Sequence, residues 1–392
     1  MKINILVLTT TRADFGLLKD LVNALSQHQL FSCAMAVGGN HADPKYGYSI
    51  EEVRKESSCP LIEFATDRVD TDEEGMIELA NSTSIGVAKA IATIRPRFLM
   101  VLGDRFEILS GCLSAVLMGV PIIHLHGGEQ TLGAIDDSVR HAITKLSAIH
   151  FVSTDLYRQR VIQLGESDET VFNVGALGVD QIVRTNFESR EQISRQLGLV
   201  FRRINILVAY HPVTNSSSTN SLEECSSLLN AMRRLENEID DIQFIFTAPN
   251  ADFQGLEILR LIENFSKTST KSILVRSLGI KYFHAVVREC DFIIGNSSSG
   301  ILESTALKTI AVNIGVRQLG RISADNIINC NGEEDQIYDA SIQAIRLSQV
   351  IDWDNIVNPY LQASTIEKIL DKIVNLSKID FKSKKFIDIS RT

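Results

Sequence analysis

Residues 124–141 read His-Leu-His-Gly-Gly-Glu-Gln-Thr-Leu-Gly-Ala-Ile-Asp-Asp-Ser-Val-Arg-His. The apolar run 120–124, typical of a buried strand, leads into them, and apolar residues then recur with helical spacing over 134–146. A strand, a glycine turn and a helix form the repeating unit of parallel α/β sheets. The stretch also holds three histidines, three carboxylates and an arginine, more titratable groups than a core needs. Because ligands of open α/β sheets bind beyond the carboxyl ends of the strands, we expect much of an active site here.

The same alternation extends along the chain in two series. Expected strands are 2–8, 32–37, 97–102, 120–124, 149–152 and 171–174, then 204–210, 242–246, 272–275, 291–294 and 309–312. Continuous apolar strands alternating with helices predict parallel sheets covered on both faces, and 392 residues exceed one ordinary core. We therefore expect two doubly wound α/β domains, 1–185 and 186–359. A last helix at 360–377 would complete the first domain, and a charged, frayed tail would occupy 378–392.

Bulk composition limits the possible partners. The chain is 44% hydrophobic and 22% charged, as in globular proteins. Its net charge of -9 argues against nucleic acid as the main partner. The first apolar run is too short for a signal peptide, and no run is long enough to cross a membrane. Six scattered cysteines without a Cys-x-x-Cys motif are typical of reduced thiols. We expect a cytoplasmic protein with no nucleic-acid or membrane partner.

Two expected strands of the first half end in polar residues. Hydroxyl groups and Arg12 follow the first strand and suit a phosphate or sugar contact, although a capped turn with Arg12 in solvent fits equally. Asp104 follows the strand 97–102 and is either a helix N-cap or a catalytic acid or base. The chain has no Gly-x-Gly-x-x-Gly fingerprint and no Walker loop, which weighs against nicotinamide and ATP enzymes.

The glycine pair of the opening segment lets the backbone approach a ligand closely, and Glu129 comes next. In the following helix, Asp136 and Arg140 flank the apolar stripe, and Asp137 and His141 lie opposite it. Each pair also fits an ordinary surface ion pair one turn apart. Together with the aspartate after the neighbouring strand, the cluster favours catalysis.

His126 belongs to a His-x-His pattern beside carboxylates, which raises the question of a metal. Two histidines at alternate strand positions lack a third ligand at metal spacing. We therefore expect no metal site.

The second half offers a possible nucleotide site. His211 follows a strand and can act as an acid or base near neutral pH, or simply be a solvated histidine. The run 295–300, Gly-Asn-Ser-Ser-Ser-Gly, joins a strand to a helix, and its Ser297, Ser298, Ser299 and Gly300 suit anion binding. Glu303 is placed to accept hydrogen bonds from ribose, and Arg317 to neutralise phosphates. A capped helix and solvated loop arginines are the structural alternatives.

In this order, the motifs Thr-Arg-Ala-Asp, Gly-Asp-Arg, His-Leu-His-Gly-Gly-Glu, Ile-Asp-Asp-Ser-Val-Arg-His-Ala-Ile-Thr-Lys, His-Pro and Gly-Asn-Ser-Ser-Ser-Gly-Ile-Leu-Glu resemble the hydrolysing UDP-N-acetylglucosamine 2-epimerases. The resemblance runs from residue 1 to about 375. It implies the GT-B arrangement, with two Rossmann-like domains, the nucleotide on the second, the sugar in the cleft and the last helix crossing back to the first domain.

The resemblance also implies a reaction. A base removes the proton on carbon 2 of the sugar while UDP leaves carbon 1, which gives 2-acetamidoglucal. Water then adds with the opposite configuration, so the products are N-acetylmannosamine, used for sialic-acid-type sugars, and UDP. No metal or redox cofactor is needed, and a homodimer or homotetramer is expected. The implied acid/base set is Asp104, Glu129 and Asp136. The diphosphate would be held by His211 and Arg12, and UDP would be held by Ser297, Ser298, Glu303 and Arg317. The sugar site would be shaped by Asp137, Arg140 and His141.

Several questions stay open at this stage. Some relatives carry Glu where this chain has His126, so the base is either His126 or Glu129. A related subgroup acts on UDP-N,N'-diacetylbacillosamine in the legionaminic acid pathway. A GT-B glycosyltransferase and a non-catalytic UDP-sugar sensor are further alternatives.

Overall fold

The computed structural model describes residues 2–42, 48–66, 73–131, 135–213, 221–249, 254–276, 278–381 and 384–388. The chain forms two compact units. The first contains residues 1–129, 135–181 and 360–392, and the second contains 130–134 and 182–359. Each unit has its own parallel sheet with helices on both faces, so the predicted class of two doubly wound α/β domains is confirmed.

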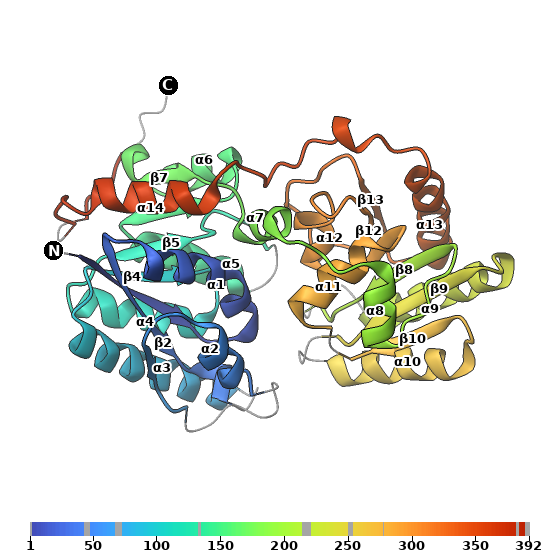
Figure 1. Ribbon diagram of the computed structural model, residues 1–392, viewed down its shortest axis with the longest axis horizontal. Coiled ribbons are helices and arrows are strands. Elements are labelled where there is room, and N and C mark those ends of the chain that lie inside the picture. Colours follow the sequence, from blue (N-terminus) through green and yellow to red (C-terminus); the bar gives the residue numbers. More distant parts are fainter. Residues whose placement is uncertain are drawn as a thin grey trace. The chain divides into compact units, whose positions relative to one another are not determined.

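Within the described ranges, the first unit contains a seven-stranded parallel sheet in the order β3-β2-β1-β4-β5-β6-β7 (Figure 1). Its central strands are mostly apolar and buried, because helices cover both faces, whereas the edge strands β3 and β7 are partly exposed. The strands are β1 (Ile3–Thr9), β2 (Phe31–Val37), β3 (Leu61–Glu63), β4 (Phe98–Leu102), β5 (Ile122–Leu125), β6 (Ile149–Val152) and β7 (Val171–Asn173).

Two helical layers enclose this sheet. One core joins it to α1 (Arg12–Gln27), α2 (Ile50–Glu56) and α14 (Thr365–Leu376), and the other joins it to α3 (Glu73–Ile94), α4 (Phe106–Leu117) and α5 (Ile135–Leu146). Helix α14 therefore packs into the first unit although it follows the whole second unit in sequence (Figure 1). The remaining elements are α6 (Asp155–Gln163), α7 (Leu177–Arg184) and the short 3-10 turns η1 (Gly39–Ala42) and η3 (Asp168–Thr170).

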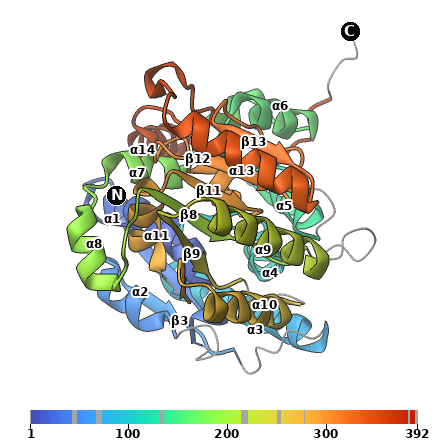
Figure 2. The same cartoon turned by 90° about the vertical axis from the view of Figure 1, so that its right-hand side faces the viewer.

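The second unit repeats the plan with six described strands in the order β10-β9-β8-β11-β12-β13. Helices α9, α10 and α13 cover one face, and α8 and α11 cover the other (Figure 2). The strands are β8 (Ile204–Ala209), β9 (Ile242–Thr247), β10 (Ser272–Val275), β11 (Phe292–Gly295), β12 (Ile310–Ile314) and β13 (Ile327–Cys330). The helices are α8 (Arg190–Leu197), α9 (Ser221–Glu238), α10 (Gly255–Thr268), α11 (Gly279–Arg288), α12 (Ser298–Leu302), α13 (Glu334–Ser348) and the turn η4 (Trp353–Asn355).

The structure differs from the expected elements at the ends of the chain's helices. The helix expected to follow the run 295–300 is the short α12, which begins inside this run at Ser298. The last helix begins at Thr365 rather than at residue 360. Among the described residues, no helix combines the length and the apolar character needed to cross a membrane.

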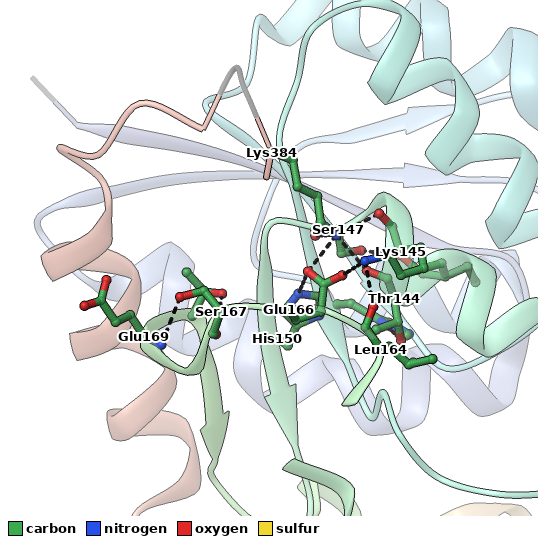
Figure 3. A network of polar contacts seen from close by, with 12 residues as sticks. Thr144, Lys145, Ser147, His150, Leu164, Glu166, Ser167, Glu169 and Lys384 are labelled. Carbon is green, nitrogen blue, oxygen red and sulfur yellow. Dashed lines mark hydrogen bonds and ion pairs between the residues drawn. The ribbon is translucent and has the colours of Figure 1, made fainter. Parts of the chain in front are cut away.

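The C-terminal segment 384–388 is attached to the first unit rather than frayed (Figure 3). The Lys384 ammonium donates to the carbonyl oxygens of Lys145 (2.7 Å) and Ser147 (2.5 Å) at the end of α5. It also lies 2.7 Å from the buried carboxylate of Glu166. A cation beside the last carbonyls of a helix is favourable, so this contact stabilises α5 from its C-terminal end.

Candidate active site

Three neighbouring strands of the first sheet bring their carboxyl ends to one edge. Because β4, β5 and β6 are adjacent and parallel, the residues that follow them lie side by side. Asp104 follows β4, His126 and Glu129 follow β5, and Ser153 follows β6. Helix α5, which leaves the same edge, adds Arg140. The sheet order thus assembles residues that are up to 49 positions apart in sequence.

Asp104 is an ion-pair partner and not a helix cap. The N-cap of α4 is Arg105, and it makes no side-chain capping bond. The guanidinium of Arg140 instead donates to Asp104 Oδ2, and it also donates to the Glu129 carbonyl oxygen at 2.9 Å. Arg140 is only 2% exposed, so the alternative of an ordinary surface ion pair does not describe it: its side chain reaches across to the end of the neighbouring strand. A buried guanidinium with fixed partners holds both acidic residues in place.

His126 and Glu129 form a hydrogen-bonded pair. His126 Nδ1 lies 2.9 Å from Glu129 Oε1, and the Ser153 hydroxyl donates to the same oxygen at 3.1 Å. The Leu177 amide donates to His126 Nε2 at 3.4 Å, which assigns the ring proton to Nδ1. His126 has φ +65°, a conformation that costs a non-glycine residue about 1 kcal/mol. Such strain at a site of polar groups is typical of functional positions.

His124, the other member of the His-x-His pattern, belongs to the framework. Its ring is fully buried, with Nε2 2.8 Å from the Gly103 carbonyl oxygen and Nδ1 3.2 Å from the Thr144 hydroxyl. Burial lowers its pKa to about 3, so the ring is neutral and donates from Nε2. It therefore connects β5 to the residue before Asp104 and to helix α5.

The first turns of α5 carry three further predicted residues. Asp136 and Asp137 lie in the first turn and are half-buried. Asp137 Oδ1 lies 3.4 Å from Arg140, and its other oxygen lies 3.6 Å from His141 Nε2. Burial lowers the pKa of His141, an effect that Asp137 opposes and Arg140 reinforces. The expected one-turn pair of Asp137 and His141 is present, but Arg140 draws Asp137 into the cluster.

Arg12 begins α1 in a capped turn. Thr11 is the N-cap, and it forms a reciprocal capping box with Asp14. The Arg12 guanidinium is half-exposed and lies 2.7 Å from Glu52. The backbone here is therefore the capped turn that we considered as an alternative. The half-exposed guanidinium of Arg12 lies at the edge of the sheet where β1 ends.

In the second unit, Asn296 holds the ends of two strands together. The His211 amide donates to Asn296 Oδ1, and Asn296 Nδ2 donates to the His211 carbonyl, both at 2.8 Å. Arg317 donates to the Asn296 carbonyl at 2.9 Å. Burial, with the nearby Arg317 charge, lowers the pKa of His211 to about 3, so its imidazole is neutral. Asn296 lies inside the motif 295–300, but the motif alone does not indicate this linking role.

The serine run reaches α12 without a side-chain cap. Ser297 is the N-cap residue but makes no capping bond through its hydroxyl, and Ser298, Ser299 and Gly300 form the first turn. Glu303 follows the helix, and its Oε2 lies 3.1 Å from Nε2 of His284 on α11. Burial opposes ionisation of Glu303, yet its pKa is lowered because His284 and the Ser299 hydroxyl interact with the carboxylate.

The described residues contain no group of three or more His, Cys, Asp or Glu that could hold a metal ion. Residues that the sequence analysis missed are mostly partners of predicted ones: Ser153, Asn296 and His284. Ser153 and Asn296 each come directly after a strand, and His284 lies in α11, the helix that precedes the serine run. These positions are the only signals that the sequence offered for them. Their contacts link segments far apart in sequence and cannot be read from spacing.

Two parallel α/β units, with acidic and basic groups collected at strand ends, define an enzyme of the two-Rossmann-domain class. The sequence model of the UDP-N-acetylglucosamine 2-epimerase family matches residues 23–374, so the chain belongs to this family, whose members are enzymes.

Individual relatives agree with this assignment. The chain is 36% identical over 84% of its length to a GDP/UDP-N,N'-diacetylbacillosamine 2-epimerase (hydrolysing) of Campylobacter jejuni, and covers 84% of it. It is 32% identical over 87% of its length to a UDP-N,N'-diacetylbacillosamine 2-epimerase (hydrolysing) of Legionella pneumophila, and covers 88% of it. The crystal structure of a UDP-GlcNAc 2-epimerase from Neisseria meningitidis bound to UDP-GlcNAc shares the fold, with a TM-score of 0.77 at 13% identity, over 95% of this chain and 100% of that one.

Proposed function

We propose that this protein is a hydrolysing 2-epimerase of a UDP-linked 2-acetamido sugar, which releases UDP and the free sugar inverted at carbon 2. The observation that carries the proposal is the cluster at the edge of the first sheet, where Asp104, His126 and Glu129 are held by Arg140 and Ser153. Proton removal at one face of a sugar and proton delivery at the other need two such groups in fixed positions.

The first step would be the loss of the carbon 2 proton together with UDP. In this proposal the His126–Glu129 pair and Asp104 form the acid/base set with Asp136. Glu129 orients the His126 ring through Nδ1, and Nε2, which accepts from the Leu177 amide at 3.4 Å, would exchange this contact for one to the substrate when it transfers a proton. Water then adds to the resulting 2-acetamidoglucal with the opposite configuration. The proposed set of sugar-site residues is Asp137, Arg140 and His141.

The second unit would hold the nucleotide. Ser297, Ser298, Ser299 and Gly300 offer hydroxyl and amide donors, and Glu303 offers an acceptor. Arg317 and His211 lie around Asn296 in the same unit and are proposed diphosphate contacts. Arg12, in the first unit, is also a proposed substrate-binding residue. Stabilisation of the charge that develops on departing UDP is the main task of these groups.

Two sugars fit this chemistry, and the relatives favour the second. UDP-N-acetylglucosamine would give N-acetylmannosamine, as the family description suggests. Two relatives, at 36% and 32% identity, are named for N,N'-diacetylbacillosamine, and on this basis we propose the 2,4-diacetamido sugar nucleotide as the preferred substrate. The free 2,4-diacetamido sugar would then be used to make a legionaminic-type acid. N-acetylmannosamine, the product of the other substrate, would be used to make a sialic-type acid.

The test is proton NMR in heavy water with each sugar nucleotide in turn. We expect release of UDP together with a free sugar that carries deuterium at carbon 2, and a higher kcat/KM for the 2,4-diacetamido substrate. Asp104→Asn and Glu129→Gln should each lower kcat at least about 100-fold. If both nucleotides stay intact, or if both variants keep full turnover, the proposal is wrong.

We also propose that the enzyme is a homo-oligomer, a dimer or tetramer. Helices α3 and α4 of the first unit expose apolar side chains to solvent, among them Ile77, Ile85, Leu113, Val116 and Leu117, of which Leu117 is 87% exposed. An exposed apolar patch of this kind marks an interaction surface, and a second copy is the occupant expected for this family. Light scattering after gel filtration should show an oligomer that Leu117→Glu weakens; a monomeric wild type would refute the proposal.

A further inference from the structure

His284 is a buried polar residue that the proposed reaction does not use. It lies in α11, which packs on one face of the second sheet, and its side chain is 6% exposed. Its Nε2 lies 3.1 Å from Oε2 of Glu303, the residue that ends α12. The two residues come from different helices and are 19 positions apart. The hydrogen bond partners the buried His284 ring and links α11 to one residue of the proposed ligand site.

The contact holds Oε2 of the Glu303 carboxylate and leaves part of the side chain exposed to a ligand. Oε2 faces His284, and the Glu303 side chain is 16% exposed, so the carboxylate is not sealed off from solvent. The Ser299 hydroxyl also interacts with the carboxylate and, with His284, lowers the pKa of Glu303 in spite of burial. The group is therefore an ionised acceptor in a set orientation before any ligand arrives.

An oriented carboxylate recognises hydroxyl groups that donate hydrogen bonds. It cannot recognise a phosphate, which it repels, and a uracil ring offers only one N–H donor. In a nucleoside diphosphate the remaining donors are the two adjacent hydroxyls of the ribose. An acidic residue that accepts from the ribose 2′-hydroxyl is the arrangement found in other Rossmann-type nucleotide sites.

We propose that His284 is a positioning residue that orients Glu303 toward the ribose of UDP, and that it thereby sets the preference for a ribonucleotide over a 2′-deoxyribonucleotide. This inference rests on the proposed function in one respect, namely that the second unit binds UDP. It adds that discrimination at the ribose depends on a residue that does not itself touch the ligand.

Isothermal titration calorimetry with UDP and 2′-deoxy-UDP, on the full-length protein, tests the inference directly. A hydrogen bond to a charged acceptor predicts that the wild type binds UDP about 10- to 100-fold more tightly than 2′-deoxy-UDP. His284→Phe keeps the ring shape but loses the donor, and should reduce this preference to within about threefold by weakening UDP alone. His284→Gln keeps an N–H donor at a similar reach and should retain most of the preference.

The pattern of losses separates a positioning role from a structural one. If His284→Phe weakens UDP and 2′-deoxy-UDP equally, the residue only supports the fold, and the inference is wrong. An unchanged preference in His284→Phe, or no preference in the wild type, overturns it as well. His28→Gln, a matched histidine change at the end of α1 in the first unit, should keep the wild-type preference.

These measurements are independent of turnover. If His284→Phe loses the ribose preference and the wild type turns over a sugar nucleotide, both proposals are supported. A wild type that shows the preference but leaves both sugar nucleotides intact would refute the proposed reaction and leave the inference about His284 standing.

Discussion

Acid should destabilise the first unit through two buried histidines, His124 and His41. Both rings are fully buried, His124 between Gly103 and Thr144, and His41 between the hydroxyls of Thr9 (2.9 Å) and Ser49 (2.8 Å). Burial lowers the pKa of His124 to about 3 and that of His41 to about 4. Between these values and the ordinary histidine pKa, each ring therefore stays neutral in the folded protein, whereas an exposed histidine is protonated.

The sign and the size follow from proton linkage. Above the ordinary histidine pKa of about 6.5, both states are neutral and the two histidines have no effect. As the pH falls below that value, the unfolded chain binds protons that the folded chain refuses, so the free energy of unfolding decreases. At about pH 5, roughly 1.5 units lower, the loss is about 2 kcal/mol for each histidine, since one unit corresponds to about 1.4 kcal/mol.

Urea unfolding at about pH 7.5 and about pH 5, followed by far-UV circular dichroism, measures this loss. Circular dichroism is the suitable probe, because the single tryptophan, Trp353, lies in the second unit. His124→Gln keeps a donor for the Gly103 carbonyl but cannot titrate, so about 2 kcal/mol of the pH-dependent loss should disappear. The double variant with His41→Gln should remove about 4 kcal/mol. If His124→Gln loses as much stability as the wild type over this range, the argument from burial is refuted.

Three further predictions concern the site. Gly128→Ala should destabilise the fold by about 2–4 kcal/mol, because φ is +77° and the added Cβ would lie 2.5 Å from a backbone carbonyl oxygen. The control is Gly198→Ala, where φ is +65° but no atom lies within 4 Å of the added Cβ. Urea unfolding should show a loss of only about 1 kcal/mol for this control. Arg140→Lys cannot hold Asp104 and the Glu129 carbonyl together, so kcat should fall about 10- to 100-fold in the NMR assay; unchanged kcat would contradict this role. His126→Gly relieves the strained φ of +65°, so unfolding should show unchanged or higher stability while turnover falls at least about 100-fold; full activity would exclude the imidazole from the chemistry.

The central strands could be predicted from the sequence because they are continuous apolar runs. Two edge strands, β3 and β13, were missed, and their burial explains why: both are short and only partly covered. Helix α8 lies directly after the domain boundary that we expected between residues 185 and 186. Only Ile193 of this helix is buried, so its apolar periodicity is too weak to identify it, whereas the capping box at Ser189 was a readable signal.

The site was predictable in composition but not in its pairings. Strand ends rich in charged residues indicated where the cluster lies. Spacing along α5 suggested only local pairs for Arg140, but its main partner, Asp104, lies 36 residues away and meets it because β4 and β5 are neighbours. Contacts of this kind depend on the order of strands in the sheet, which a single sequence does not specify.

In the proposed reaction, the two histidines of the His-x-His pattern divide the framework and the chemistry between them. His124 has ordinary strand geometry, is fully buried, and spends both ring nitrogens on fixed partners, Gly103 and Thr144. His126 is held in a backbone conformation that glycine adopts without cost, so the backbone alone gives no reason for a histidine there. Its ring is partly accessible, with Nδ1 held by the Glu129 carboxylate and Nε2 accepting a longer hydrogen bond, 3.4 Å, from the Leu177 amide. Strain that persists only because the surroundings impose it is expected where the side chain performs a function. For this reason the imidazole of His126, oriented by Glu129, is the proton-transfer group that we place first, and His124 is the residue that keeps its strand and Asp104 in register.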